Sequence, residues 1–357
     1  MKRIKYCTDK AQLLEILRKY GVPIEDEESL YHPFPIYYPM NYILRLLSNV
    51  YTDKEKVQVR NMLIPRKEKI LEEPTNDTRL AIIPEEITEK SEETVVKSPL
   101  KGLTRGYEDR VLISPVGQCA VNCPWCFRTR QSGTLSDEDL ERILNYIKND
   151  ERIEDVILTG GEPLLFPIER LEKLLNDLRS IPHVKIIRFH TRLPIVAPEY
   201  FSNKMIRLIG SFNKPNRPIY FVVQIVHPAE IDMEVATLIH KIARQGIPVL
   251  NQAPVLRGVN DDFETFKEWL KKMIHVGVKP YYVIVPIIRR GSNDFYSVKY
   301  DKVAELVAEY SSRYDGLGRP TIIIPVMGRK MSPLDLREKM MQKHGIHYRT
   351  TKIEIWW

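Results

Sequence analysis

From residue 111 onward, short apolar runs alternate with segments in which apolar residues recur every three or four positions. The runs predict buried strands, and the periodic segments predict helices that cover them. Strands are expected at 111–116, 153–158, 184–189, 219–226, 247–253, 281–288 and 321–325, with helices after Ser136 and at 168–178, 198–209, 231–244, 263–275 and 298–314. Six strand–helix units in succession favour parallel strands joined by right-handed crossovers. The predicted fold is therefore α/β, a partial six-unit (β/α) barrel whose ligand contacts lie at the carboxyl ends of the strands.

The front of the chain has a different pattern. Helical spacing predicts helices at 9–20, 41–49 and 54–62, and a proline- and tyrosine-rich stretch at 32–39 cannot be regular helix. Charged residues between two prolines indicate a mostly exposed connector. We expect four parts: a helical N-terminal region over 1–84, a connector over 85–106, the barrel over 107–326 and a C-terminal extension over 327–357.

Composition is that of a globular protein: of 357 residues, 43% are hydrophobic and 28% are charged. No apolar run reaches the roughly 20 residues of a membrane span, and no signal-peptide core follows the basic N-terminus, so a cytoplasmic location is expected. The net charge of +7 permits attraction to nucleic acid. However, the 54 basic and 47 acidic residues are intermingled, which favours a mixed-charge surface.

Three of the four cysteines form one motif. Cys119, Cys123 and Cys126 have the spacing C-x3-C-x2-C, whereas Cys7 stands alone as a small buried or surface residue. Thiolates suit iron–sulfur clusters and zinc, but a structural zinc site takes four protein ligands and no fourth is evident. Three thiolates on a four-iron cluster leave one iron open for a substrate or cofactor. We therefore favour such a cluster, with a zinc knuckle or surface thiols as the alternatives.

The motif resembles the cluster loop of the radical S-adenosylmethionine (SAM) superfamily. A second segment, Thr-Gly-Gly-Glu-Pro at 159–163, resembles the superfamily's motif beneath the SAM amino group. The resemblance implies that the three cysteines hold a [4Fe–4S] cluster whose open iron binds SAM. It also implies that reductive cleavage of SAM gives a radical that abstracts hydrogen from an unreactive C–H bond.

Longer segments between about residues 35 and 330 resemble the lysine 2,3-aminomutase (KamA) family of that superfamily. The family-specific segments lie at 102–111, 186–194, 227–231, 248–261 and 279–282. The resemblance implies pyridoxal phosphate (PLP) as a further cofactor and migration of an amino group from carbon 2 to carbon 3. The residues it implies are Gly160, Gly161, Glu162, Gln224, Asn251, Gln252, Arg257 and Asn260 for SAM, Arg110, Arg192 and Lys330 for PLP, and Arg128 for the substrate carboxylate.

The chain departs from the family pattern around the substrate. The segment before Lys330 has one glycine where the family has a glycine-rich run. The aspartates that face the distal ammonium of a lysine substrate are matched by Ile287 and by an isoleucine at 323–324. Burying an ammonium without a carboxylate is costly, so a substrate other than lysine is expected. Arg289 and Arg290 favour an anionic or differently shaped one.

The leading interpretation is a radical SAM enzyme that abstracts hydrogen from an amino-acid-like small molecule, with PLP retained or lost. One alternative is a radical SAM enzyme that modifies a protein or tRNA group, and another is a non-enzymatic iron–sulfur or zinc protein. The expected partners are an electron donor of flavodoxin or ferredoxin type and a second copy of the chain, with apolar residues at 353–357 as a possible contact. No membrane partner is expected.

Overall fold

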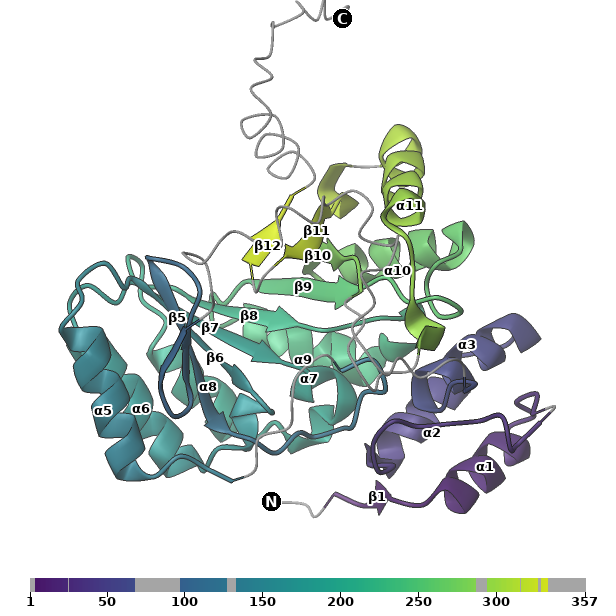
Figure 1. Cartoon of the computed structure of the whole chain (residues 1–357), viewed down its shortest axis with the longest axis horizontal. Coiled ribbons are helices and arrows are strands. Elements are labelled where there is room, and N and C mark those ends of the chain that lie inside the picture. Colours follow the sequence, from purple (N-terminus) through teal and green to yellow (C-terminus); the bar gives the residue numbers. More distant parts are fainter. Residues whose placement is uncertain are drawn as a thin grey trace, which may run out of the picture.

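The structure, a computed structural model, describes residues 4–24, 26–67, 97–126, 133–286, 294–314, 316–326 and 329–332. Its centre is a ten-stranded sheet in the order β12-β11-β10-β9-β8-β7-β6-β5-β4-β3 (Figure 1). The parallel strands are β5 (Arg110–Val116), β6 (Asp155–Gly160), β7 (Ile186–Thr191), β8 (Ile219–Val223), β9 (Val249–Pro254), β10 (Val278–Ile284) and β11 (Thr321–Val326). Each pairs with the next in the chain, which confirms the predicted α/β fold.

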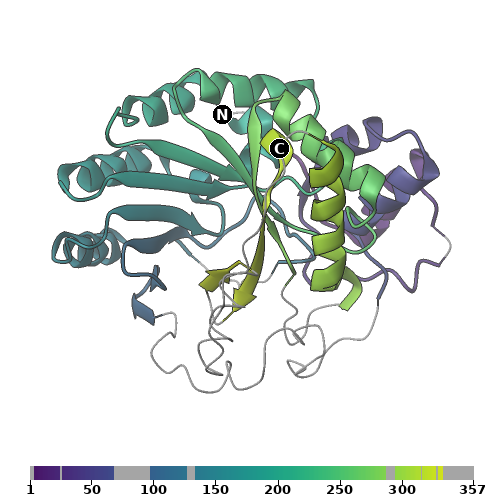
Figure 2. The same ribbon diagram turned by 90° about the horizontal axis from the view of Figure 1, so that it is seen from above.

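Helices cover the outer side of the curved sheet (Figure 2). They are α5 (Asp137–Lys148), α6 (Ile168–Ser180), α8 (Asn203–Ser211), α9 (Met233–Ala243), α10 (Phe263–His275) and α11 (Tyr300–Arg313). Local chemistry fixes their ends. At α5, the Ser136 hydroxyl accepts from the Asp139 amide (3.1 Å) and the Asp139 carboxylate accepts from the Ser136 amide (3.2 Å), which is a capping box. Gly246 ends the α9 segment at φ 71°, a backbone conformation that favours glycine.

The two faces of the strands differ in burial. In β5, Val111 and Ile113 are fully buried against the helices, whereas Arg110, Leu112 and Ser114 on the other face are only half-buried. β7 repeats this alternation because successive side chains point to opposite faces of a sheet, whereas β6 between them is buried along most of its length. The inner face is therefore partly accessible and carries polar side chains, and it is the face on which a ligand would bind.

One predicted helix, 198–209, is divided. The structure has a short α7 (Leu193–Val196), a 3-10 turn at Pro198–Tyr200 and then α8. Ser202 starts α8 afresh, because its hydroxyl accepts from the Met205 amide at 3.1 Å. Several strands also end earlier than their apolar runs suggest, since residues such as Ile225 and Val226 continue into buried loops.

The N-terminal region contains α1 (Lys10–Lys19), α2 (Met40–Ser48) and α3 (Asp53–Leu63), as helical spacing predicts. It also contains a short antiparallel pair, β1 (Tyr6–Cys7) and β2 (Tyr38–Pro39). Part of the expected connector belongs to the sheet, because β3 (Lys97–Leu100) and β4 (Leu103–Arg105) extend it beyond β5 in antiparallel fashion. At the other edge, β12 (Arg329–Met331) pairs antiparallel with β11.

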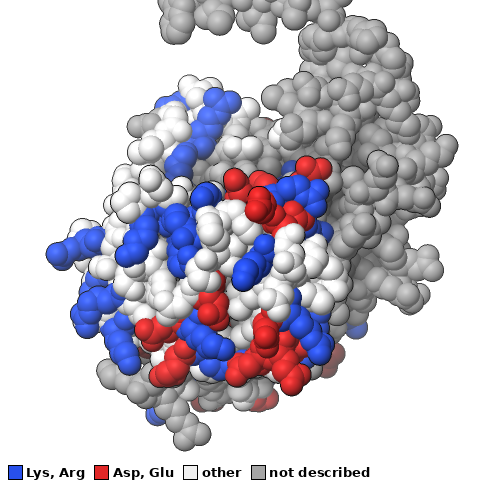
Figure 3. Space-filling view, turned by 90° about the vertical axis from the view of Figure 1, so that its left-hand side faces the viewer, with Lys and Arg blue, Asp and Glu red and all other residues white. Residues whose placement is uncertain are grey.

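Charge is mixed on the face that holds α5 and α6. Figure 3 shows basic and acidic side chains interspersed there, with no extended area of one sign. Several of these charges pair across elements, for example Arg170 on α6 with Asp137 on α5 (2.6 Å). Such pairing is the pattern expected of a solvated surface. Among the helices of the described residues, none is both long enough and apolar enough to cross a membrane.

Candidate functional site

The cysteine loop follows β5 and lies directly on the turn that follows β6. The Gly161 amide donates to the Val116 carbonyl (3.1 Å), and the Glu162 amide donates to the Gln118 carbonyl (2.7 Å). A Cβ on Gly161 would stand 2.3 Å from the Gln118 carbonyl oxygen and 2.5 Å from that of Gly117. Two segments that the sequence singled out are thus in backbone contact, and only a residue without a side chain permits it.

Gly160 is required for a second reason. Its φ is 104°, and a Cβ there would lie 2.5 Å from the Cβ of Ser114 on the adjacent strand. The chain turns sharply at this point, so that the following residues pass under the cysteine loop. The two neighbouring glycines therefore shape the floor of the site, and their place beside SAM stays a prediction.

The cysteines lie at half-buried positions in the loop, and no disulfide involves them within the described residues. The Cys126 amide donates to the Cys123 carbonyl (3.0 Å), which closes a tight turn between the last two. Burial raises the pKa of the Cys123 thiol, and the charge of Arg192 opposes that rise. Within the described ranges, no three His, Cys, Asp or Glu side chains converge on one point that a single metal ion could occupy. A cubane cluster places each thiolate on a different iron, so it needs no such point.

The proline- and tyrosine-rich stretch forms the back of the cysteine loop. The Asn122 amide donates to the Tyr37 carbonyl (3.0 Å), and the Asn122 side chain donates to the Pro35 carbonyl (2.7 Å). The His32 ring lies 3.0 Å from the Asn122 carbonyl. This stretch, expected only as irregular chain, thus positions the loop from behind. Its composition gave no signal of that contact.

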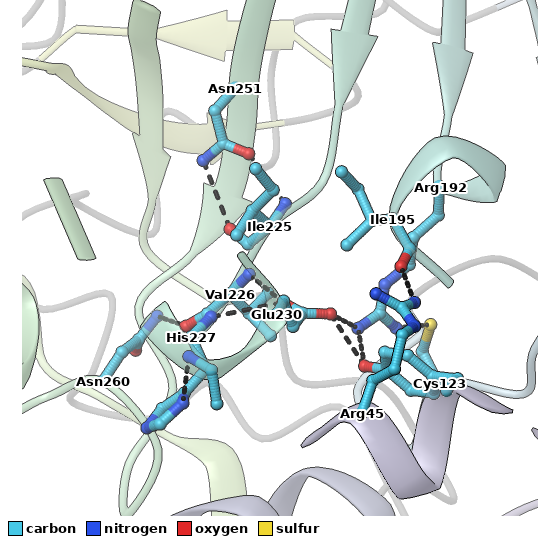
Figure 4. Close-up of polar contacts among 12 residues, drawn as sticks. Arg45, Cys123, Arg192, Ile195, Ile225, Val226, His227, Glu230, Asn251 and Asn260 are labelled. Atoms are coloured by element: carbon cyan, nitrogen blue, oxygen red, sulfur yellow. Dashed lines mark hydrogen bonds and ion pairs between the residues drawn. The ribbon is translucent and has the colours of Figure 1, made fainter. Parts of the chain in front are cut away.

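Arg192, one of the residues expected to bind PLP, lies at the cysteine loop beside Cys123 (Figure 4). Its Nη1 is 2.6 Å from Cys123 Sγ, and its Nη2 donates to Tyr42 Oη (2.9 Å) and to Glu230 Oε1 (2.7 Å). The guanidinium also lies over the Trp125 ring. These contacts occupy its terminal nitrogens and place Arg192 at the cysteine loop, whereas PLP binding by Arg192 stays a prediction.

Tyr42 and Glu230 were not among the predicted site residues. Glu230 belongs to the family-like segment 227–231, which was a usable signal. Tyr42 lies on α2, where it looks like an ordinary buried aromatic residue of an amphipathic helix. It comes to the site only because α2 packs against the turn that carries Glu230.

Glu162 is turned into the protein. Its Oε1 accepts from Thr191 Oγ1 (2.6 Å) and the Leu164 amide (3.2 Å), and its Oε2 accepts from the amides of Arg192 (2.9 Å) and Leu193 (3.0 Å). Burial raises the pKa of this carboxyl, while the donors oppose the rise. The side chain therefore fixes the start of α7, and the binding of SAM by Glu162 stays a prediction.

Asn251 and Asn260, both predicted near SAM, also bind backbone (Figure 4). Asn251 Oδ1 accepts from the Ile225 amide (2.7 Å). Asn260 Nδ2 donates to the Val226 carbonyl (2.8 Å), and its Oδ1 accepts from the Leu256 amide (2.6 Å). Both side chains are at most 1% exposed. They clamp the loop after β8 and have no contact with open space.

The remaining residues predicted for SAM are more accessible. Gln224 follows β8 at a half-buried position. Gln252 lies on the inner face of β9, where its Oε1 accepts from Lys330 Nζ (2.5 Å). Arg257 Nε donates to the Phe295 carbonyl (2.7 Å). The structure thus leaves glutamines at the ends of two adjacent strands as the side chains best placed for a ligand.

Arg110 and Lys330 are far apart in the sequence, but both contact Tyr107. Tyr107 Oη accepts from the Lys330 amide (2.8 Å), although the two residues are 223 positions apart in the chain. The Arg110 guanidinium lies 4.5 Å from the centroid of the same Tyr107 ring. Lys330 Nζ lies 5.2 Å from the centroid of the Tyr282 ring. A primary amine, a guanidinium and aromatic rings therefore meet at the inner face.

Carboxylates are scarce in the parallel strands. Within the bounds of β5 to β11, Asp155 is the one Asp or Glu residue. Its carboxylate is paired with Arg188, which donates through Nε at 3.1 Å and also through Nη2. Burial raises the pKa of Asp155, and the charges of Arg188 and Arg110 oppose the rise. The inner face thus has an excess of positive charge.

Some predicted residues lie outside the described residues. These are Arg128, Ile287, Arg289, Arg290 and the apolar residues at 353–357. The isoleucines at 323–324 are described: both are buried, and Ile323 pairs with Ile284 in register across β10 and β11. The absence of carboxylates near that position therefore holds for the described strands.

Comparison with known proteins decides the family. Residues 113–270 match the model of the radical SAM superfamily. L-lysine 2,3-aminomutase of Buchnera aphidicola is 30% identical over 72% of this chain and 78% of its own length. A provisionally named L-lysine 2,3-aminomutase of Aquifex aeolicus is 36% identical over 72% of each chain. The chain belongs to the lysine 2,3-aminomutase family. It spans about half (55%) of the Clostridium subterminale L-lysine 2,3-aminomutase, to which it is 32% identical.

As a radical SAM member of the aminomutase family, the protein is an enzyme that uses a [4Fe–4S] cluster and SAM. The cysteine motif and the glycine turn, which the structure brings into contact, both lie within the matched residues. Membership in this family excludes the non-enzymatic alternative. It leaves the substrate and the use of PLP to be argued from the inner face of this barrel.

Proposed function

We propose that this enzyme abstracts hydrogen from an amino acid held by PLP on the inner face of the barrel and moves its amino group, as an aminomutase does. The observation that carries the proposal is the meeting of Lys330 and Arg110 around Tyr107. PLP enzymes need a lysine amine for the cofactor's aldehyde and a cation for its phosphate. Both groups are present, on one face, beside aromatic rings.

The chemical types of these residues match the groups of PLP that need binding. Lys330 would hold the aldehyde carbon, and Arg110 would bind the phosphate. When bound, PLP supplies an electron-accepting ring that assists an amino shift. Gln252 Oε1 accepts from the Lys330 amine and thereby aims it at the inner face. Tyr107 binds the Lys330 backbone and so fixes β12 against the segment that precedes β5.

The charge of the inner face supports a substrate without a side-chain cation. Asp155, the one carboxylate within the parallel strands, already forms an ion pair with Arg188. A second ammonium from a lysine side chain would have to be buried beside Ile323 and Ile284 without a partner. That costs several kcal/mol. A neutral or acidic amino acid avoids this cost, and its carboxylate is free to bind Arg128, as the family resemblance predicts.

Covalent trapping tests the use of PLP. The anaerobically reconstituted protein is incubated with PLP, reduced with borohydride and digested, and the labelled peptide is identified by mass spectrometry. We expect the label on Lys330 and its loss in Lys330→Ala. Lys279→Ala is the matched control, since the Lys279 ammonium on β10 is bound by the carbonyls of Leu317 and Arg319. A label on another lysine, or none, would refute the proposal.

A separate assay tests the substrate. Formation of 5′-deoxyadenosine from SAM is measured with lysine and with neutral and acidic amino acids under a one-electron reductant. We expect neutral or acidic amino acids to stimulate it at least tenfold more than lysine does, because about 1.4 kcal/mol corresponds to each factor of ten. If lysine is the best substrate, the substrate proposal is wrong while the assignment of Lys330 stands. The natural electron donor and self-association stay predictions from the sequence.

A further inference from the structure

A buried cation touches one of the cluster cysteines. Arg192 Nη1 lies 2.6 Å from Cys123 Sγ, and the arginine side chain is 9% exposed. Its guanidinium carbon lies 4.9 Å from the centroid of the Trp125 ring, which belongs to the same loop. Because water is largely kept away, the charge acts on its surroundings through a low dielectric. Whatever charge the cluster carries is therefore felt by this arginine.

The guanidinium is held in place from the side opposite the cluster (Figure 4). Glu230 Oε1 accepts from Arg192 Nη2 (2.7 Å) and from Tyr42 Oη (2.7 Å). Glu230 Oε2 accepts from the amides of Val226 (2.6 Å) and His227 (3.2 Å), so this carboxylate is itself fixed by the backbone. Arg192 thus stands between a fixed negative charge and a cluster ligand.

We propose that Arg192 sets the reduction potential of the cluster. The inference rests on the cluster itself and is independent of PLP and of the substrate. Reduction transfers one electron from a ferredoxin- or flavodoxin-type donor to the cluster, lowers the charge of its core from 2+ to 1+ and takes up no proton. Hydrogen bonds and positive charge at cluster sulfurs favour the more negative, reduced form. Arg192 supplies both at Cys123, and Glu230 offsets part of the effect.

This arrangement predicts shifts of opposite sign from its two charged partners. Removing the cation with Arg192→Met should lower the midpoint potential, since the reduced cluster loses its stabilising charge. Removing the anion with Glu230→Gln should raise it, since the field of Arg192 is then less compensated. Arg192→Lys keeps the charge but can make fewer hydrogen bonds, so its potential should lie between those of the wild type and Arg192→Met.

Arg45→Met is the matched control. Arg45 is a second buried arginine in the same region, with a side chain that is 13% exposed. It joins α2 to the barrel through Asp232 (2.5 Å) and the Ile195 carbonyl (2.6 Å), and its hydrogen bonds within the described residues involve no cysteine. This variant loses a comparable ion pair, and its cluster should titrate at the wild-type potential.

The experiment is an anaerobic redox titration of the reconstituted full-length protein, followed by electron paramagnetic resonance of the reduced cluster, with iron and sulfide counted in each variant. The order Arg192→Met, Arg192→Lys, wild type and Glu230→Gln, from low to high potential, supports the proposal. A wild-type potential in Arg192→Met, or an equal shift in Arg45→Met, overturns it.

If Arg192→Met takes up no cluster, Arg192→Lys and Glu230→Gln decide. Shifts of opposite sign relative to the wild type support the proposal, and no shift or shifts of the same sign overturn it. Because the readout is a potential, a wild-type protein that holds the cluster yet cleaves no SAM would count against the proposed function and not against this inference.

Discussion

His227 is a histidine that the fold keeps uncharged. It is 1% exposed, its Nδ1 accepts from the Ala229 amide (3.1 Å), and its Nε2 lies 3.1 Å from Gln58 Oε1. Since Nδ1 is an acceptor here, the ring proton belongs on Nε2 and is donated to the glutamine. Burial lowers the pKa of His227 to about 3 from an ordinary value of 6.5. It therefore joins the barrel to α3 as a neutral group and is a core histidine.

This makes His227 a source of pH-dependent stability. Between pH 6.5 and 3 the unfolded chain binds a proton at this residue and the folded chain does not, so stability is full above pH 6.5 and falls as the pH is lowered. Between pH 6.5 and 5, the free energy of unfolding of the wild type should fall by about 2 kcal/mol more than that of His227→Gln. Denaturant unfolding at a series of pH values measures the difference.

Four charges act on the protonation of His227, and an exposed histidine provides the control for that test. Among nearby charges, Glu55 and Asp262 favour its protonation, whereas Lys272 and Lys54 oppose it. His240→Gln, at an exposed position of α9, should retain the wild-type slope. Parallel pH dependences in the wild type and His227→Gln would show that this histidine is not the group responsible.

Residue types could be predicted from the sequence better than residue roles. The three cysteines and the two glycines each stand out in a short local motif, although the glycines are required by contacts with Ser114 and Gln118 on a distant segment. Arg192 and Asn260 were assigned to ligands because polar residues in a family-like segment suggest binding. Their partners, such as Cys123 and Val226, lie far away in the sequence, and no local pattern indicates them.

At the scale of elements, the loop after β8 is held by side chains from β9, from α10 and from the segment between them. Asn251 of β9 binds the Ile225 backbone, Trp269 of α10 donates to the Ile225 carbonyl (3.1 Å), and Asn260 binds the Val226 carbonyl. A buried loop needs such partners because its amides and carbonyls have no water. These asparagines thus replace the pairing that a longer strand would have provided.

Asn260→Ala should destabilise the protein even without SAM. The substitution leaves the Leu256 amide and the Val226 carbonyl buried and unpaired, at a cost of about 2–3 kcal/mol. Gln224→Ala, at the half-buried position just after β8, should cost less than about 0.5 kcal/mol. Chemical denaturation of both variants without SAM measures the difference. Equal stabilities, with a defect in SAM binding alone, would instead return Asn260 to the role of a ligand.

Helices and strands followed from periodicity where one face of each is buried. The α10 segment, for example, has the bounds that its apolar spacing predicts. Prediction was less accurate where tertiary contacts override local pattern. The 198–209 segment is broken because Ser202 caps a new helix, and the expected connector ends in strands because β5 offers an unpaired edge to β4.

At the scale of the whole molecule, the N-terminal helices and the barrel share one core. A single cluster of buried apolar side chains includes Leu17 and Ile43 from the helices and Phe189 and Trp269 from the barrel. Polar contacts cross the same boundary, for instance the Asn61 side chain with the Gly258 carbonyl (2.8 Å). The sequence suggested an accessory region, but its contacts with the cysteine loop depend on packing between distant segments.

The shared core predicts one cooperative unfolding transition. If the N-terminal helices were a separate unit, they would unfold independently; here their loss would expose the apolar side of the barrel loops. We expect a single calorimetric peak, and amides of α2 that exchange hydrogen as slowly as those of α9. An early transition in which α2 loses protection while α9 keeps it would contradict this expectation.

Lys330 is held in place by its backbone, whereas its proposed chemistry takes place at its side chain. Tyr107 holds this residue by its main-chain amide, and that bond does not involve the side-chain nitrogen. In the proposed function, the amine would therefore be able to bind and release PLP while the hairpin that carries it stays in place. The Lys330 ammonium itself donates a hydrogen bond to Gln252 Oε1, and that bond would have to break when the amine reacts.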